Sequence, residues 1–249
     1  MDEAKQIADW ERELLEPSGR APSERRRRRV LAWFTAGAIV FALVVVGGPW
    51  LYFHIQGAAP KQLTLPVGPG GTTGPVNGTW KVSSPSEVQY RVQEILFNQH
   101  HTAVGTTSKV TGSMTIVGAT VTSAQFKVDM GSVESDQAGR NVTFDDEIMD
   151  TSTYPNAYFT LTQPIDLTQV PVPGQVVSVV AQGNLTLRGK SRAVSFPLEA
   201  ERDGAGIDVN GSLTIHFGTW GIPNPSFAIA QVGDTGTIDL LLHLVEPSS

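Results

Sequence analysis

Histidine, carboxylate and hydroxyl groups are the side chains of this 249-residue chain that could do acid–base, nucleophilic or metal chemistry, because it contains no cysteine. Its five histidines do not stand at metal-binding spacings, since neither H-x₃-H nor H-E-x-x-H occurs. His100 and His101 are adjacent, so their rings cannot easily chelate one ion together, and we interpret them as surface loop residues. His54 follows an apolar segment, and His216 and His243 fall on the outward side of alternating stretches. The histidines therefore predict no metal site.

The acidic residues are equally uninformative about catalysis. Asp145, Asp146 and Glu147 are consecutive, but they lack the alternating oxygen ligands and central glycine of a calcium loop. Asp136 and Arg140 are four residues apart, which favours a helical ion pair over a catalytic couple. The G-x-S-x-G, P-loop and G-x-G-x-x-G motifs are absent. We therefore predict no catalytic residues, no metal and no cofactor, and the formal net charge of −6 argues against nucleic-acid binding.

The elements that position these side chains are predicted to be β-strands, because apolar and polar residues alternate over most of residues 79–246. The predicted strands are Ser86–Ile95, Thr106–Val117, Thr120–Met130, Ala157–Gln163, Val176–Arg188, Arg192–Glu201, Gly206–Phe217 and Gly236–Val245. Residues 137–150 break the alternation and predict a short capping helix. Eight antiparallel strands joined by short turns fit an all-β fold, either a closed barrel or a two-sheet sandwich, because both have the same periodicity.

The inward face of the predicted strands is apolar and uncharged. The opposite face of the first strand carries Glu87, Gln89, Arg91 and Gln93. The residues expected to line a ligand cavity are Tyr90, Val92, Phe126, Val128, Phe144, Met149, Phe159, Leu161, Leu185, Leu187, Phe196, Ile215, Phe217 and Trp220. A cavity with such a lining favours an apolar, chain-like ligand.

An uncharged stretch of twenty-four residues, Val30–Phe53, precedes the strands. As a helix it is about 36 Å long, enough to cross a hydrocarbon core of about 30 Å. The run Arg25–Arg29 adjoins only its N-terminal end, which predicts a cytoplasmic N-terminus. We predict a cytoplasmic stub at residues 1–29, an uncleaved transmembrane signal anchor at 30–55, a Gly/Pro-rich linker at 56–78 and an extracytoplasmic domain at 79–246. A cleaved signal peptide is the alternative.

Several motifs, in order, resemble those of the YceI-like, polyisoprenoid-binding family. They are Ser86-x-Val88-x-Tyr90-x-Val92, Val110–Met114, the stretch from Arg140-Asn141 through Tyr154-Pro155 to Phe159, Gly183–Gly189 and Trp220–Ile222. The resemblance covers about residues 79–246 and implies an extended, eight-stranded antiparallel, lipocalin-like barrel. Its long cavity would hold an isoprenoid or related lipid tail, in a protein of the cell envelope. The chain departs from the family pattern at Glu94, Asn141, Phe217 and Thr219, where His, Asp, Arg and Asp are usual.

Three classes of function follow from these patterns. The first is a single-pass, membrane-tethered protein that binds a polyisoprenoid or similar long apolar chain, an isoprenoid quinone included, and is not an enzyme. The second is an enzyme acting on such a lipid or on a small apolar substrate, which requires a polar pair inside the cavity. The third is a structural or adhesive domain of the cell envelope, which requires a contiguous apolar patch on the outer face.

Overall fold

The structure of the chain is a computed structural model with two compact units, Met1–Gly57 and Ala58–Ser249. It describes residues 38–48, 51, 59–66, 76–96, 98–167, 174–203, 206–226 and 230–246.

In the first unit, residues 38–42 are α-helical, and the helix continues as a π-helix, η1 (Leu43–Gly47). Its large apolar side chains are exposed: Ile39, Val40, Phe41, Leu43, Val44 and Val45. Within the described stretches, no helix has both the length and the apolar character needed to cross a bilayer. The predicted stub at 1–29 and the rest of the predicted anchor, residues 30–37, 49–50 and 52–55, lie outside the described residues.

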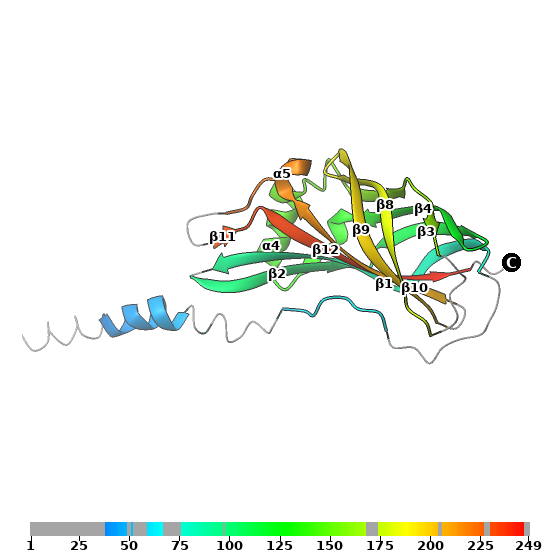
Figure 1. Cartoon of the computed structure of the whole chain (residues 1–249). Helices are drawn as coiled ribbons and strands as arrows, with labels where there is room; N and C mark the ends of the chain where they lie inside the picture. Colours follow the sequence, from blue (N-terminus) through cyan, green and yellow to red (C-terminus); the bar gives the residue numbers. More distant parts are fainter. Residues whose placement is uncertain are drawn as a thin grey trace, which may run out of the picture. The chain divides into compact units, whose positions relative to one another are not determined.

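The second unit is built around a closed antiparallel barrel of eight strands (Figure 1). The strands are β1 (Gly78–Leu96), β3 (Val110–Val117), β4 (Thr120–Asp129), β6 (Asn156–Leu161), β8 (Val177–Leu187), β9 (Lys190–Asp203), β10 (Gly206–His216) and β12 (Thr235–Val245). Each strand pairs with the next in this order, and β12 returns to pair with β1, for example at Tyr90 opposite Ile238. We call this β1–β12 pairing the seam. The closure confirms the predicted barrel and rules out the sandwich.

The strand β1 is longer than predicted and has two partners on one side. Its first residues, Gly78–Lys81, pair with β3, and Val88–Leu96 pair with β2 (Gln99–Thr107). His100 and His101 therefore lie on a strand, which corrects their prediction as loop residues. Short strands extend the sheet: β5 (Glu134–Ser135) pairs with β2, β7 (Ile165–Asp166) with β4, and β11 (Ala230–Val232) with β1.

Helical turns cover one end of the barrel. The predicted capping helix is confirmed as α4 (Ala138–Thr143), which continues into a π-helix, η3 (Phe144–Ile148). A 3₁₀ turn, η2 (Met130–Ser132), follows β4, and a single turn, α5 (Phe217–Trp220), follows β10. The turn α5 ends at Gly221, whose φ of 66° lies in the left-handed region that favours glycine.

The buried side chains form two clusters, which follow one another along the barrel strands. The aliphatic cluster consists of Val76, Trp80, Val110, Ile116, Val121, Leu167, Ile207, Val209, Leu242 and Leu244. The aromatic cluster consists of Val133, Phe144, Met149, Ala157, Leu185, Leu187, Ile215, Phe217, Trp220 and Ile222. Strand β10 contributes to both, with Val209 in the first and Ile215 in the second, so the clusters follow one another along the barrel.

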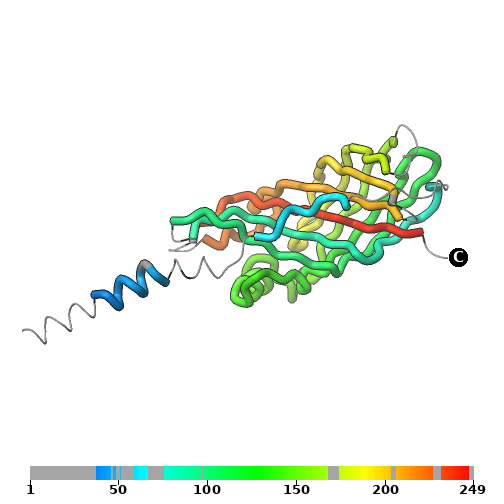
Figure 2. The backbone as a smooth tube through the Cα atoms, turned by 90° about the horizontal axis from the view of Figure 1, so that it is seen from below, coloured from blue at the N-terminus to red at the C-terminus, as the bar shows by residue number. Residues whose placement is uncertain are grey.

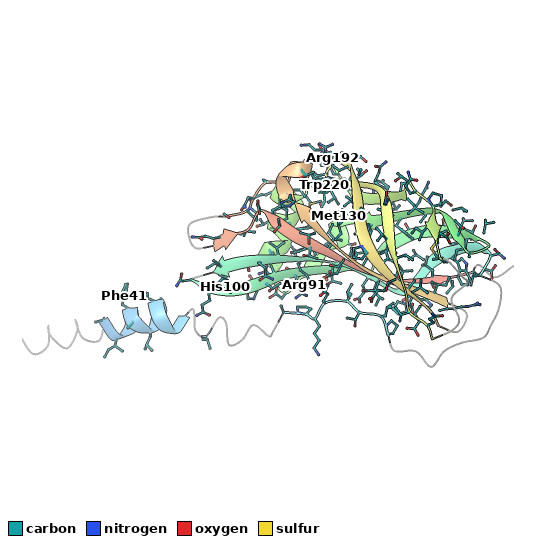
Figure 3. All side chains as sticks on the ribbon, in the orientation of Figure 1. Phe41, Arg91, His100, Met130, Arg192 and Trp220 are labelled. Carbon is teal, nitrogen blue, oxygen red and sulfur yellow. The ribbon has the colours of Figure 1, made fainter. Side chains whose placement is uncertain are left out.

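Residues 59–66, which belong to the predicted linker, run along the outside of the barrel (Figure 2). Arg91 of β1 lies on this side (Figure 3) and donates a hydrogen bond from Nη1 to the Pro60 carbonyl. The predicted linker residues 56–58 and 67–75 lie outside the described residues. This part of the linker therefore packs on the barrel.

Candidate functional site

The structure brings most of the fourteen predicted lining residues together in one half of the barrel. Seven of them are members of the aromatic cluster: Phe144, Met149, Leu185, Leu187, Ile215, Phe217 and Trp220. Tyr90, Val92 and Val128 pack against the same cluster. Phe126 and Leu161 pack against the aliphatic cluster instead. Phe159 and Phe196 meet edge to face, with ring centroids 5.6 Å apart.

A cavity of about 70 Å³ lies in the other half, beside the aliphatic cluster. It is lined by Val76, Met114, Ile116, Val121, Ile165, Leu167, Val177, Val179, Leu198, Ala200, Glu201, Arg202, Ile207 and Val209. None of the predicted lining residues borders it, so their contact with a ligand stays a prediction. Alternation along β8, β9 and β10 gives the inward direction of Val179, Leu198 and Val209, but it does not show which half of the barrel keeps free volume.

The size of this cavity limits what fits without rearrangement. An apolar cavity of about 150 Å³ holds one benzene molecule. The volume of about 70 Å³ is therefore enough for only a short part of an apolar chain. A longer chain requires side chains of one or both clusters to move aside, which costs packing contacts that the bound chain must replace.

Tyr90 connects the barrel wall to the helical cover. Its ring stacks on Phe144 of η3, with centroids 5.2 Å apart and planes 10° from parallel. Burial raises the pKa of Tyr90 to about 12, and the nearby carboxylates of Asp136 and Glu94 act in the same direction while Arg140 opposes them. The phenol therefore stays protonated at neutral pH. It cannot act as a phenolate base there.

A polar network beside Tyr90 ties α4 to β1. Arg140 Nη2 donates to Glu94 Oε1 at 3.2 Å, and His101 Nδ1 lies 3.0 Å from the same oxygen. Arg140 also pairs with Asp136, which confirms the predicted (i, i+4) ion pair. Glu94 stands where the family that the sequence resembles usually has histidine. In this chain, its hydrogen bond with Arg140 joins the capping helix α4 to strand β1. Asn141, another departure, accepts hydrogen bonds at Oδ1 from the amide and the hydroxyl of Ser135.

Ser86, Asp208 and His243 have the residue types of a catalytic triad but not its arrangement. His243 Nδ1 lies 2.7 Å from Asp208 Oδ1. The Ser86 hydroxyl, however, accepts from the backbone amide of His243 at 2.9 Å and donates to the Ser83 carbonyl at 2.6 Å. A nucleophilic serine would contact the imidazole ring instead. Within the described residues, no three His, Asp or Glu side chains are placed to hold a metal ion.

Comparison with known proteins agrees with this architecture. The family model of the YceI-like domain matches residues 80–244. No curated protein matches the chain. Among solved structures, Burkholderia cenocepacia BcnA is 22% identical, with a TM-score of 0.52 over 65% of this chain and 98% of that one. A polyisoprenoid binding domain from Saccharophagus degradans, implicated in plant cell wall breakdown, is 20% identical, with a TM-score of 0.55 over 68% of this chain and 98% of that one.

These likenesses show the fold, and the family model matches the barrel from Trp80 in β1 to Leu244 in β12. With the ordered motifs, the closed eight-stranded barrel and the apolar interior in agreement, the chain belongs to the YceI-like family.

Proposed function

We propose that this protein is a membrane-tethered, extracytoplasmic lipid-binding protein whose barrel holds a polyisoprenoid or similar long apolar chain. The observation that carries the proposal is the apolar cavity beside the aliphatic cluster, in which twelve of the lining residues are apolar. The polyisoprenoid binding domain from Saccharophagus degradans, which shares the fold, supports the class of ligand.

The arrangement of the clusters suggests how a long chain would bind. Val128 packs against both clusters, so the two halves form one apolar interior without a polar layer between them. A chain that fills the cavity first would extend toward the aromatic cluster by displacing side chains at this boundary. Burial of each further methylene group contributes about 0.8 kcal/mol, which favours long ligands over short ones.

Membrane tethering is supported by the first unit. Its described helical residues expose large apolar side chains, with Phe41 at 68% and Val44 at 66%. Such side chains are costly to leave in water and are stabilised in hydrocarbon. Together with the adjoining run Arg25–Arg29, they support a single-pass anchor with the N-terminus inside. Protease added outside intact cells should then digest the barrel domain but spare the N-terminal stub.

Lipid binding is tested by two neighbouring substitutions on β8. Val179 borders the cavity, whereas Val180 is 56% exposed on the outer face. Val179→Phe should fill the cavity and weaken binding of a fluorescent farnesyl analogue by about tenfold, at an overpacking cost of about 1–3 kcal/mol. Val180→Phe should leave binding unchanged. Equal binding by both variants, or no binding by the parent protein, would contradict the proposal.

Mass spectrometry of an organic extract from the purified protein is the complementary measurement. A co-purifying isoprenoid or other long-chain lipid is expected. Melting curves of both variants report whether Val179→Phe has disturbed the fold and not only the cavity.

A further inference from the structure

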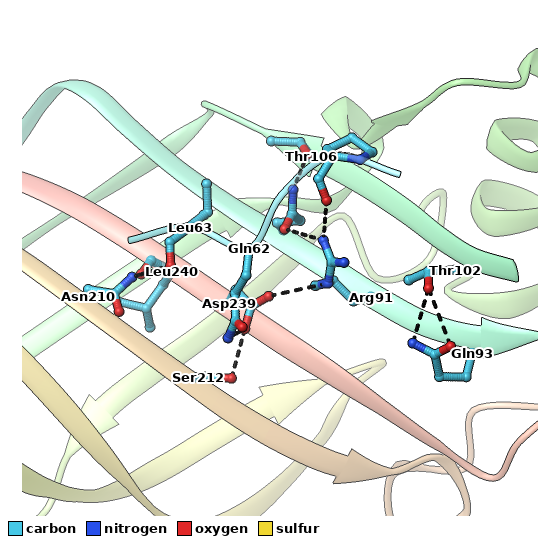
Figure 4. Close-up of polar contacts among 12 residues, drawn as sticks. Gln62, Leu63, Arg91, Gln93, Thr102, Thr106, Asn210, Ser212, Asp239 and Leu240 are labelled. Carbon is cyan, nitrogen blue, oxygen red and sulfur yellow. Dashed lines mark hydrogen bonds and ion pairs between the residues drawn. The ribbon is translucent and has the colours of Figure 1, made fainter. Parts of the chain in front are cut away.

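Residues 59–66, which we call the strap, cross three adjacent strands of the barrel wall (Figure 4). Arg91 Nη1 of β1 donates to the Pro60 carbonyl at 2.5 Å, and Asn210 Nδ2 of β10 donates to the Leu63 carbonyl at 2.9 Å. Between them, Gln62 Nε2 donates to Asp239 Oδ1 of β12 at 3.1 Å. The strap therefore lies directly over the seam between the first and last strands.

Asp239 is completely buried beneath the strap, although its position in β12 points away from the barrel interior. Its Oδ1 accepts hydrogen bonds from Ser212 at 2.7 Å and from Gln62. Its Oδ2 accepts none from the described residues, and Arg91 Nε lies 3.9 Å from it. Burying a carboxylate with one oxygen unsatisfied is costly. When the strap is released, water can hydrate Asp239. The free energy gained by this hydration would offset part of the free energy lost with the strap's hydrogen bonds.

Gln89 is a second buried polar residue on the outer face of the seam. It lies opposite Asp239 in the seam and was predicted to face outward, yet it is only 2% exposed. Its amide donates to Thr106 Oγ1 at 3.3 Å, and its carbonyl accepts from Arg91 at 3.3 Å. Gln89 is thus bonded to Arg91, and the strap bonds to Arg91 and to Asp239. Release of the strap would expose a polar surface that water can solvate.

The strap crosses the seam at the boundary between the two core clusters. On the inner face, the pair Val88–Leu240 packs against the aliphatic cluster, and the pair Tyr90–Ile238 packs against the aromatic cluster. The Gln89–Asp239 pair lies between them on the outer face. Nearby, the register of the seam shifts between Ser83 and Glu87, so the backbone ladder is interrupted there. The strap thus reinforces the wall beside its irregular stretch.

We propose that the strap is a clamp on the seam that sets how fast an apolar chain enters and leaves the barrel, a regulatory role that rests on the proposed lipid-binding function. With the strap docked, β1, β12 and β10 are held together at the boundary between the clusters. With the strap released, Asp239 and Gln89 are hydrated and the seam separates there, opening a lateral path to both halves. A clamp of this kind changes the rates of exchange but not the equilibrium affinity.

The test uses the full chain and two strap variants that leave the barrel sequence intact. Gln62→Glu places a carboxylate against the buried Asp239 carboxylate, so repulsion should release the strap. The double variant Leu63→Ser/Leu65→Ser removes the apolar side chains that are half-buried against the wall. Thr64→Glu is the matched control, because it adds the same charge at an exposed strap position.

Stopped-flow fluorescence with a farnesyl analogue gives the association and dissociation rate constants. Gln62→Glu and the double variant should raise both constants by about tenfold and leave Kd within about twofold, since loss of one charge-assisted hydrogen bond corresponds to about that factor. Thr64→Glu should change neither constant. Hydrogen exchange should become faster in β1 and β12 and stay unchanged in β4 and β6.

Two results overturn the clamp while leaving lipid binding in place. One is unchanged rate constants in both strap variants. The other is a change in Kd produced by the dissociation rate alone, which would make the strap part of the binding site. Failure of the parent protein to bind the analogue is a separate result: it overturns the proposed function and the clamp with it.

Discussion

The two halves of the barrel interior are closed by different kinds of structure. In the aromatic cluster, rings carried by η3 and α5 fill the end of the barrel, and Trp220 Nε1 donates to the Leu185 carbonyl at 3.3 Å. In the aliphatic cluster, mainly branched side chains, most of them from strands, meet beside a cavity of about 70 Å³. Among the described residues, this cavity lies in the half whose core side chains come mostly from strands.

The largest expected effect is on the free energy of unfolding, when a leucine is replaced by alanine in each half of the barrel. Leu185→Ala removes a side chain from the filled aromatic cluster and should destabilise the protein by about 3–5 kcal/mol. Leu198→Ala acts beside the cavity, where the leucine already lacks neighbours on one side, and should cost at least about 1 kcal/mol less.

Urea unfolding of the parent and both variants measures this difference. Leu198→Ala should also strengthen binding of the farnesyl analogue, because it enlarges the cavity, while Leu185→Ala should not. Equal destabilisation, with no gain in binding, would remove the distinction between the two halves.

The next effect is the pH dependence of stability that Tyr90 confers on the aromatic half. Burial raises its pKa to about 12 from 10.0, so the folded protein holds the phenolic proton more tightly than the unfolded chain. The stabilisation is fully present below pH 10 and is lost as the pH rises toward 12. The free energy of unfolding lost when Tyr90 has fully ionised is about 2–3 kcal/mol.

Denaturant unfolding between pH 9 and pH 12 detects this loss, and Tyr90→Phe is the control. The parent should lose stability more steeply than the variant over that interval, even though lysines titrate in both. Parallel curves would show that Tyr90 is not buried as described.

The smallest effect concerns the attachment of the helical cover. Glu94→Gln removes the charge that joins Arg140 and His101 to β1, and these partly exposed contacts are worth about 1 kcal/mol or less. Hydrogen exchange in α4 should become faster. Asp136→Asn changes the more exposed partner of Arg140 and should accelerate hydrogen exchange in α4 less than Glu94→Gln does. If Asp136→Asn has the larger effect on exchange, Asp136 and not Glu94 holds the helix in place.

The barrel was predictable because its strands bury one face, which imposes alternation on the sequence. Strand β2 could not be predicted, because His100, His101 and Thr102 are consecutive polar residues and do not alternate with apolar ones. It forms by pairing with the second half of β1, whose backbone groups it bonds. The direction of Val179 and Leu198 could be inferred from parity. The free volume beside them could not, because it depends on how side chains from distant strands meet.

The alternation of residues along the strands could not predict the burial of Gln89 and Asp239 either, for a different reason. Both occupy outward positions. Asp239 accepts a hydrogen bond from Gln62 of residues 59–66, a segment with no periodic pattern and a composition typical of linkers. A local sequence pattern predicts which face of a strand a residue occupies. It does not predict that an irregular segment from elsewhere will pack over that face.

The pairing of β1 with β12 also has a consequence for biogenesis. Lys81 lies opposite Val245, so the seam joins the first strand of the barrel to its last. During synthesis, β1 through β10 can pair in succession, but the sheet remains open until the C-terminal strand emerges. Until then β1 and β10 each present an unpaired edge that can add strands from other chains. Truncation within Thr235–Val245 should therefore leave a chain that aggregates, because β12 is the strand that closes the sheet into a barrel.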